Sequence, residues 1–195
     1  MIPRTIAITG GIGCGKSVVS RILRLRGYTV VDTDSHARAI MDTDEEIKRR
    51  LAEEIAAETV VDGQIDRRRL ARIVFVDRGK LERLNAIVHG KVRESLMRMA
   101  ADSPCPLFIE TAILFQSGLN RMVDAEWRVV CPPELRISRV MARNGISRDE
   151  VLARMGSQDF TPAPSEPQPP LTLIHNDEVH SLLVQISDAL AAAGL

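Results

Sequence analysis

"TIAITGGIGCGKSVVSRILRLRG", residues 5–27, joins a β-branched run to an amphipathic stretch through a glycine-rich segment. The run from Thr5 to Thr9 predicts a buried strand. Beyond Lys16 the apolar residues recur at roughly helical spacing, and Gly27 stands where a helix C-terminal glycine belongs. The stretch therefore predicts a strand, a loop and a helix in that order, at the start of an α/β fold.

The loop between this strand and this helix fits the pattern G-x-x-x-x-G-K-[ST], from Gly10 to Ser17. Glycines at such spacing let successive backbone N–H groups point inward around phosphate oxygens, at the positive end of the following helix. Lys16 is expected to reach the β- and γ-phosphates of a nucleoside triphosphate, and the Ser17 hydroxyl to hold Mg²⁺. A glycine-rich turn of chance composition is the weaker interpretation.

Composition and charge exclude several function classes. The 195 residues hold 26 basic and 26 acidic side chains, so the molecule lacks the net field that attracts nucleic acid or anionic lipid. No apolar stretch approaches the roughly 20 residues that span a bilayer, and the first ten residues lack a signal-peptide segment. The three cysteines include no C-x-x-C pair and fit reduced thiols. We expect a cytoplasmic protein that binds neither nucleic acid nor membrane.

Strand and helix patterns alternate along the rest of the chain. Four further strands are predicted in "YTVVDTD" (28–34), "PLFIETAILF" (106–115), "EWRVVCPP" (126–133) and "LTLIHND" (171–177). Strands that alternate with helices predict an α/β fold, a three-layer arrangement in which helices cover both faces of a parallel sheet. Ligands of such sheets bind beyond the carboxyl ends of the strands. The predicted phosphate loop lies at that edge.

Three regions of a single domain are expected. The segment 35–103 is helical and highly charged, broken at "VDGQID", Gly79 and Gly90, and it predicts a helical insertion. "PPELRISRVMARNG" and "SRDEVLARMGSQ" predict two consecutive helices, the second with a capping box of Ser147 and Glu150. The proline-rich segment from Pro162 to Pro170 predicts a loop or flap. We therefore expect a nucleotide-binding core (1–34, 104–135, 171–195), a substrate-binding insertion (35–103) and a lid (136–170).

Two carboxylates stand at the end of the second predicted strand, Asp32 and Asp34. Beside a phosphate loop, such a pair can orient Mg²⁺-bound water and accept a proton from an attacking hydroxyl. An Asp after a strand is also a common N-cap of the next helix, and one of the two is expected to serve in that way. Glu110 ends another strand and is a second candidate for metal contact.

Ordered blocks along the chain resemble those of the dephospho-coenzyme A kinase family. They are "TGGIGCGKS", "VVDTDSHAR", "DGQIDRRRLARIVFVD", "LNAIVHGKV", "ETAILFQSGL", "CPPELRISRVMARNGISRDEVLARMGSQ" and "IHND". The resemblance covers nearly the whole chain and implies the P-loop kinase fold with a helical substrate domain and a lid. It implies that ATP, with Mg²⁺, phosphorylates the ribose 3′-hydroxyl of dephospho-coenzyme A to give coenzyme A and ADP, the final step of coenzyme A biosynthesis.

The same resemblance implies roles for single residues. Asp34 matches the general base, Asp32 an acid near the metal and the substrate, and Arg38 a substrate-phosphate contact. His89 matches a substrate-binding histidine, although "HG" replaces the usual "HP", and a packed core histidine is the alternative. The residues that match nucleotide contacts are Gly11, Gly13, Cys14, Gly15, Lys16, Ser17, Val18, Arg143 and Asn176.

Arg139 and Arg143 lie four residues apart on one predicted helix and match lid arginines, where positive charge would stabilise the transferred phosphoryl group. We assign the catalytic part to Lys16 and Arg139 together with Asp34. Arg67, Arg68 and Arg69 are interpreted as the solvated first turn of a helix capped by Asp66.

Two other functions stay open from the sequence. One is a different small-molecule kinase on the same core, acting on a nucleoside monophosphate, shikimate or uridine. The other is a nucleotide-binding regulator that lacks a base, for which Asp34 is the discriminating residue. The expected partner is the small-molecule substrate, with the chain as a monomer or a small homo-oligomer.

Overall fold

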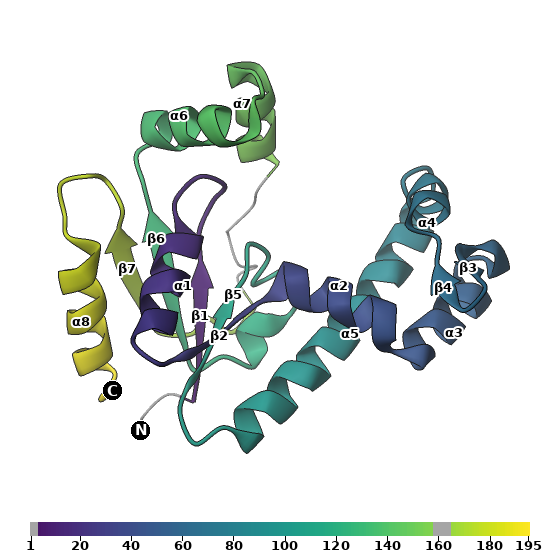
Figure 1. Ribbon diagram of the computed structural model, residues 1–195, viewed down its shortest axis with the longest axis horizontal. Coiled ribbons are helices and arrows are strands. Elements are labelled where there is room, and N and C mark those ends of the chain that lie inside the picture. Colours follow the sequence, from purple (N-terminus) through teal and green to yellow (C-terminus); the bar gives the residue numbers. More distant parts are fainter. Residues whose placement is uncertain (1–3, 158–164) are drawn as a thin grey trace. The chain divides into compact units, whose positions relative to one another are not determined.

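The computed structural model describes residues 4–157 and 165–195 (Figure 1). It divides into two compact units, one formed by Met1–Asp32 and Asp102–Leu195 and the other by Thr33–Ala101. The first unit contains the predicted phosphate loop and all five strands of a parallel sheet. The second unit is mainly helical.

The sheet of the first unit has the order β2-β5-β1-β6-β7, and every neighbouring pair is parallel. Its strands are β1 (Thr5–Thr9), β2 (Thr29–Asp32), β5 (Leu107–Glu110), β6 (Ala125–Val130) and β7 (Leu171–His175). All five match predicted strands, so the expected α/β class with a parallel sheet is confirmed. The strand β1 is buried throughout and lies at the centre, which places the loop that follows it in the middle of the sheet edge.

Two helices pack on this sheet, α1 (Lys16–Leu25) and α8 (Leu182–Ala192). Val19 and Leu23 of α1 and Ile186 of α8 are completely buried in one cluster with the sheet residues. Phe108 and Trp127 lie edge to face within that cluster, with ring centroids 5.3 Å apart. Gly27 adopts a φ of 90° just beyond α1, where the sequence predicts the helix to end. This core fixes the strand and helix that flank the loop.

The predicted helix pair follows β6 as α6 (Pro133–Asn144) and α7 (Arg148–Gly156). Figure 1 shows both beyond the carboxyl ends of the sheet strands. The capping box of Ser147 and Glu150 is present, as predicted. A short 3₁₀ helix, η2 (Leu119–Arg121), precedes β6. Of the predicted proline-rich loop, residues 162–164 lie outside the described residues, and 165–170 contain no helix or strand.

The second unit carries four α helices, a 3₁₀ turn and a hairpin. Its elements are α2 (Thr33–Thr43), α3 (Glu45–Glu54), η1 (Ala57–Thr59), β3 (Val60–Val61), β4 (Gln64–Ile65), α4 (Arg67–Val74) and α5 (Arg78–Asp102). Its core is a cluster that includes Ile47, Leu51 and Ile87. Asp66 caps α4 by accepting from the backbone N–H of Arg68 and Arg69, as predicted.

The expected break at Gly90 is wrong, because α5 continues through this residue. The break expected at Gly79 lies a few residues earlier, between the end of α4 at Val74 and the start of α5 at Arg78. A glycine inside a helix costs about 1 kcal/mol relative to alanine. Packing offsets this cost, since Ile87 and Val92, on either side of Gly90, are buried. The predicted turn in "VDGQID" is a two-stranded antiparallel hairpin, in which Asp62 and Gly63 both adopt positive φ.

Candidate functional site

The glycine-rich loop runs from the end of β1 to the start of α1. Gly13 and Gly15 adopt φ values of 78° and 95°, which a residue with a side chain rarely adopts. The loop closes on itself, since the Cys14 N–H donates to the Gly11 carbonyl at 3.2 Å. The ammonium group of Lys16 donates to the Gly10 carbonyl at 2.8 Å. The loop is therefore folded as a cradle, with its lysine held across it.

A cavity of about 370 Å³ opens beside this loop within the first unit. It is lined by Gly11, Ile12, Gly13, Gly15, Lys16, Ser17, Val18, Glu110, Arg139 and Arg143. Three cations, one carboxylate and the start of a helix thus surround one space. Such a lining fits a polyanion, because cationic donors and helix N-termini both bind phosphate oxygens.

Both lid arginines reach this cavity from α6. One guanidinium nitrogen of Arg139 donates to the Asn176 backbone carbonyl at 3.1 Å, and another pairs with the Glu178 carboxylate at 3.1 Å. Arg143 donates to the Asn144 side chain at 2.8 Å. Arg139 is therefore anchored to the segment after β7, whereas Arg143 is bonded only within its own helix end among the described residues.

Asn176 lies directly against the loop. Its amide group donates to the Cys14 carbonyl at 2.8 Å, and its backbone N–H donates to the Val130 carbonyl at 2.8 Å. The Cys14 side chain is only 1% exposed and belongs to the core beneath the loop, so only its backbone can serve a ligand. Burial raises the pKa of this thiol. The expected contact of Asn176 with the nucleotide stays a prediction.

Two acidic residues end neighbouring strands at the carboxyl edge of the sheet. Asp32 of β2 and Glu110 of β5 are register partners on neighbouring parallel strands. Glu110 also lines the cavity, as does Ser17 in the first turn of α1. Carboxylate and hydroxyl oxygens are the donors that Mg²⁺ prefers in proteins. The donor set in this unit therefore fits a magnesium ion.

Asp34, Arg38 and His89 belong to the second unit. Asp34 is exposed in the first turn of α2 rather than at the strand end where the sequence places it, and Arg38 is exposed one turn later. His89 is half-buried in α5, and its burial, with a smaller effect of Arg93, lowers its pKa. The structure thus brings the loop, Glu110 and the two lid arginines together around one cavity of the first unit. Asp34, Arg38 and His89 belong to the second unit and do not line that cavity.

Sequence reasoning missed Arg136. This α6 residue is half-buried, and its Nε donates to the Ile12 carbonyl of the loop at 3.0 Å. Its position one turn before Arg139 gives no sign of that contact, because the contact depends on how α6 packs on the loop. A buried pair was missed for the same reason: the Thr9 hydroxyl at the end of β1 donates to the Glu126 carboxylate of β6.

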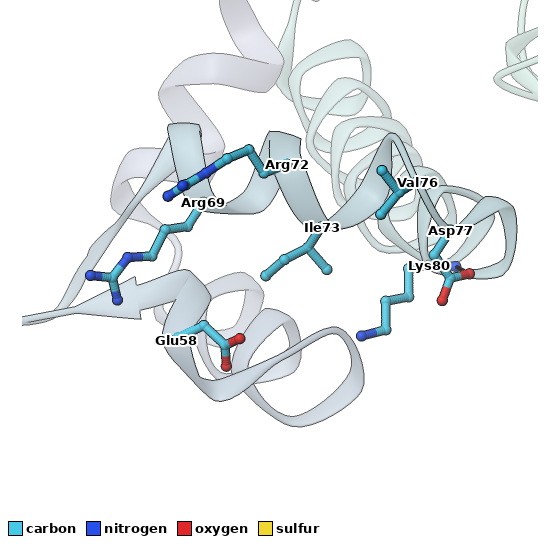
Figure 2. A pocket seen from close by; sticks show the side chains of 7 residues that line it. All are labelled: Glu58, Arg69, Arg72, Ile73, Val76, Asp77 and Lys80. Carbon is cyan, nitrogen blue, oxygen red and sulfur yellow. Dashed lines mark hydrogen bonds between the residues drawn. The ribbon is translucent and has the colours of Figure 1, made fainter.

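A second cavity, of about 490 Å³, lies within the helical unit (Figure 2). It is lined by Glu58, Arg69, Arg72, Ile73, Val76, Asp77 and Lys80. Figure 2 shows Glu58, Ile73 and Lys80 pointing toward one another from three elements. Arg72 and Lys80 form no ion pair with any residue that the structure describes.

Among residues 4–157 and 165–195, no helix is long and apolar enough to cross a membrane.

Comparison with known proteins identifies a family that this chain resembles over most of its length. The family model described as Dephospho-CoA kinase matches residues 4–163. A dephospho-CoA kinase from Thermus thermophilus is 46% identical over 158 residues, which cover 80% of this chain and 75% of the relative. One from Carboxydothermus hydrogenoformans is 38% identical, covering 78% and 77% of the two chains.

Solved structures agree with these relatives. The crystal structure of TT1252 from Thermus thermophilus is 40% identical with a TM-score of 0.71, covering 98% of this chain and 96% of that one. The dephospho-CoA kinase from Campylobacter jejuni, at 22% identity and a TM-score of 0.62, covers 98% and 96% and shares the fold. A model match across most of the chain, relatives of high identity and a phosphate loop that lines a cationic cavity lead to one conclusion: the chain belongs to the dephospho-CoA kinase family.

Proposed function

We propose that this protein transfers the γ-phosphoryl group of ATP to the ribose 3′-hydroxyl of dephospho-coenzyme A, giving coenzyme A and ADP. The observation that carries the proposal is the cavity where the glycine-rich loop, Lys16, Arg139 and Arg143 meet, in a chain of this family. The 3′ oxygen forms a bond to the γ-phosphorus while the bond from that phosphorus to the β-γ bridging oxygen breaks. The hydroxyl proton needs an acceptor.

The loop and the cations of the first unit hold the donor nucleotide in this proposal. Backbone N–H groups between Gly11 and Ser17 surround the phosphates. The Lys16 ammonium group stabilises the negative charge of the γ-phosphoryl group during its transfer. The guanidinium groups of Arg139 and Arg143 offer fixed donors to the oxygens of the transferred group. Arg139 would exchange its present partner Glu178 for phosphate.

Ser17, Asp32 and Glu110 would hold Mg²⁺, since Asp32 and Glu110 end neighbouring strands and Glu110 lines the same cavity as Ser17. When bound, the ion neutralises charge that develops between the β- and γ-phosphates. Asp34 is proposed as the base that accepts the hydroxyl proton, and its exposed carboxylate supports the role because it can reach solvent-borne substrate. Arg38 and His89 are proposed substrate contacts.

We infer that the helical unit binds the acceptor substrate. The cavity in Figure 2 supports this role, since Arg72 and Lys80 offer charge for phosphate oxygens beside the apolar Ile73. Arg72→Gln is expected to raise the KM for dephospho-coenzyme A several-fold and to leave the KM for ATP unchanged. Arg49→Gln, an exposed arginine paired with Glu53 in the same unit, is the matched control. Equal KM values for dephospho-coenzyme A in the Arg72 and Arg49 variants would contradict this assignment.

The acceptor is tested by measuring ADP release with dephospho-coenzyme A against AMP, uridine, shikimate and pantothenate. Turnover is expected with dephospho-coenzyme A alone. Rapid turnover of another acceptor would favour a different small-molecule kinase, and nucleotide binding without turnover would favour a regulator. We further propose that the protein acts in the cytoplasm, where the reducing environment agrees with its three free cysteines. We propose that it acts as a monomer or small homo-oligomer.

A further inference from the structure

The first turn of α6 lies on the glycine-rich loop, and Arg136 makes the contact. Its Nε donates to the Ile12 carbonyl at 3.0 Å. Its guanidinium group also lies against Gly11, where a Cβ atom would collide with it. The Arg136 backbone also lies close to the loop, because a Cβ atom on Gly13 would be 2.7 Å from the Arg136 carbonyl oxygen. One residue thus contacts two successive peptides of the loop.

The contact determines which way one peptide of the loop faces. In a trans peptide the C=O and the following N–H point in opposite directions, and the structure contains no cis peptide among its described residues. Arg136 holds the Ile12 carbonyl, so the Gly13 N–H points away from Arg136. That N–H has no acceptor within the described part of the chain. Gly13 itself lines the cavity, whereas Arg136 is not one of the lining residues.

We propose that Arg136 is a positioning residue, which holds the Ile12–Gly13 peptide so that the Gly13 N–H faces the phosphates of the bound nucleotide. This inference rests on the nucleotide binding in the proposed function. Because Arg136 acts through the loop, it does not touch the reacting atoms. Without its bond, the peptide can rotate, and a carbonyl oxygen would then face the phosphate and repel it. Gly13 allows such rotation easily, since glycine adopts both signs of φ.

Two variants separate the hydrogen bond from the packing of the side chain. Arg136→Met keeps an unbranched stem but has no donor, whereas Arg136→Lys keeps a positive donor at its end. We expect ADP to bind about tenfold more weakly to Arg136→Met, which corresponds to the loss of one charged hydrogen bond. Arg136→Lys is expected to bind within about threefold of the unchanged protein. Arg154→Gln, an exposed arginine of α7, is the control and should bind ADP normally.

Calorimetric titration of the full chain with ADP measures these affinities, and thermal unfolding checks that each variant is folded. Binding by Arg136→Met within twofold of the unchanged protein would overturn the proposal, and so would a lysine variant as weak as the methionine variant. In the unchanged protein, NMR should show a large shift of the Gly13 amide proton on ADP binding. A Gly13 proton that does not respond would also overturn it, whatever the variants do. Failure of the proposed function would instead leave ADP binding intact and abolish turnover of the acceptor.

Discussion

Asp34 lies exposed in the first turn of α2. If it takes the proton from the acceptor hydroxyl, Asp34→Asn keeps the side chain's size but removes the base. General-base catalysis contributes typically about 10² to 10⁴ in rate. We therefore expect kcat to fall by that factor in steady-state assays, with the affinity for ATP nearly unchanged in titrations. Full activity of the variant would move the base elsewhere, with Asp32 the first alternative.

Asp32→Asn is the matched control for this experiment, since Asp32 lies beside Glu110 at the sheet edge and is proposed to hold Mg²⁺. Higher Mg²⁺ concentration should partly restore the activity of Asp32→Asn and leave Asp34→Asn inactive. If both variants recover equally, or if Asp34→Asn loses ATP binding together with turnover, Asp34 is a metal or structural residue.

Lys16 places its charge in the cavity proposed to hold the phosphates, and its ammonium group donates to the Gly10 carbonyl at 2.8 Å. Lys16→Ala removes a preorganised cationic donor whose partner charge grows in the transition state. The loss of one such donor typically costs about 10² to 10³ in rate, so kcat should fall by about 10² or more. The measurement is kcat under saturating ATP. An unchanged kcat would mean that the loop is not where the chemistry occurs.

Single residues differ in how far the sequence predicts them. Lys16 and Ser17 follow from local spacing, because the strand, the loop and the helix are consecutive and place both residues without help from the rest of the chain. Arg136 and Asn176 contact the same loop from more than 100 residues away. Such contacts depend on how separate elements pack, and residue type alone does not predict them.

Among the elements, the loop has the least room for change at Gly15. This residue adopts a φ of 95°, and a Cβ atom there would collide with the Asn176 amide. In Gly15→Ala the loop or Asn176 must move, so ADP binding should weaken by roughly tenfold or more in titrations. Gly27→Ala is the control, since Gly27 has a similar φ of 90° but open space around it. It should lose stability and keep its affinity for ADP, and equal affinities in the two variants would contradict this account.

Acid sensitivity is expected in the packing of α2 on α5. His36 of α2 lies 2.9 Å from the Ser95 hydroxyl of α5, and burial lowers the pKa of His36 from its ordinary 6.5. Burial lowers the pKa of His89 as well, with a smaller effect of Arg93. As the pH falls below about 6.5, the unfolded chain takes up protons that the folded chain does not, so the free energy of unfolding should fall.

Denaturant unfolding between about pH 7.5 and 5.5 measures this effect. The double variant His36→Gln/His89→Gln should show a flatter dependence of the free energy of unfolding on pH than the unchanged protein. The same slope in both proteins would show that these histidines do not cause the acid sensitivity.

The elements of the sheet were predictable because buried β-branched runs end in glycine, proline or acidic residues. The elements of the helical unit were harder to predict from the sequence. The helix α5 continues through Gly90 because its neighbours Ile87 and Val92 are buried, and a local cost of about 1 kcal/mol does not outweigh that packing. The hairpin of β3 and β4 has two residues in each strand, too few to produce a periodic signal.

For the whole molecule, ordered motifs across the chain were sufficient to predict the family, since the family model matches residues 4–163. Each block alone is a weak signal, but their order and spacing together are specific. Residue types do not describe the outline of a binding site, so the acceptor had to come from the resemblance. The acceptor is consequently the central claim to test.

The most direct test is the position of the phosphate in the product. The protein is incubated with ATP, Mg²⁺ and dephospho-coenzyme A, and the product is analysed by mass spectrometry and ³¹P NMR. The account predicts one added phosphate, a monoester on the ribose 3′ oxygen, formed in equal amount to ADP. Phosphate at another position, or an unmodified dephospho-coenzyme A beside clear turnover of a different acceptor, would contradict it.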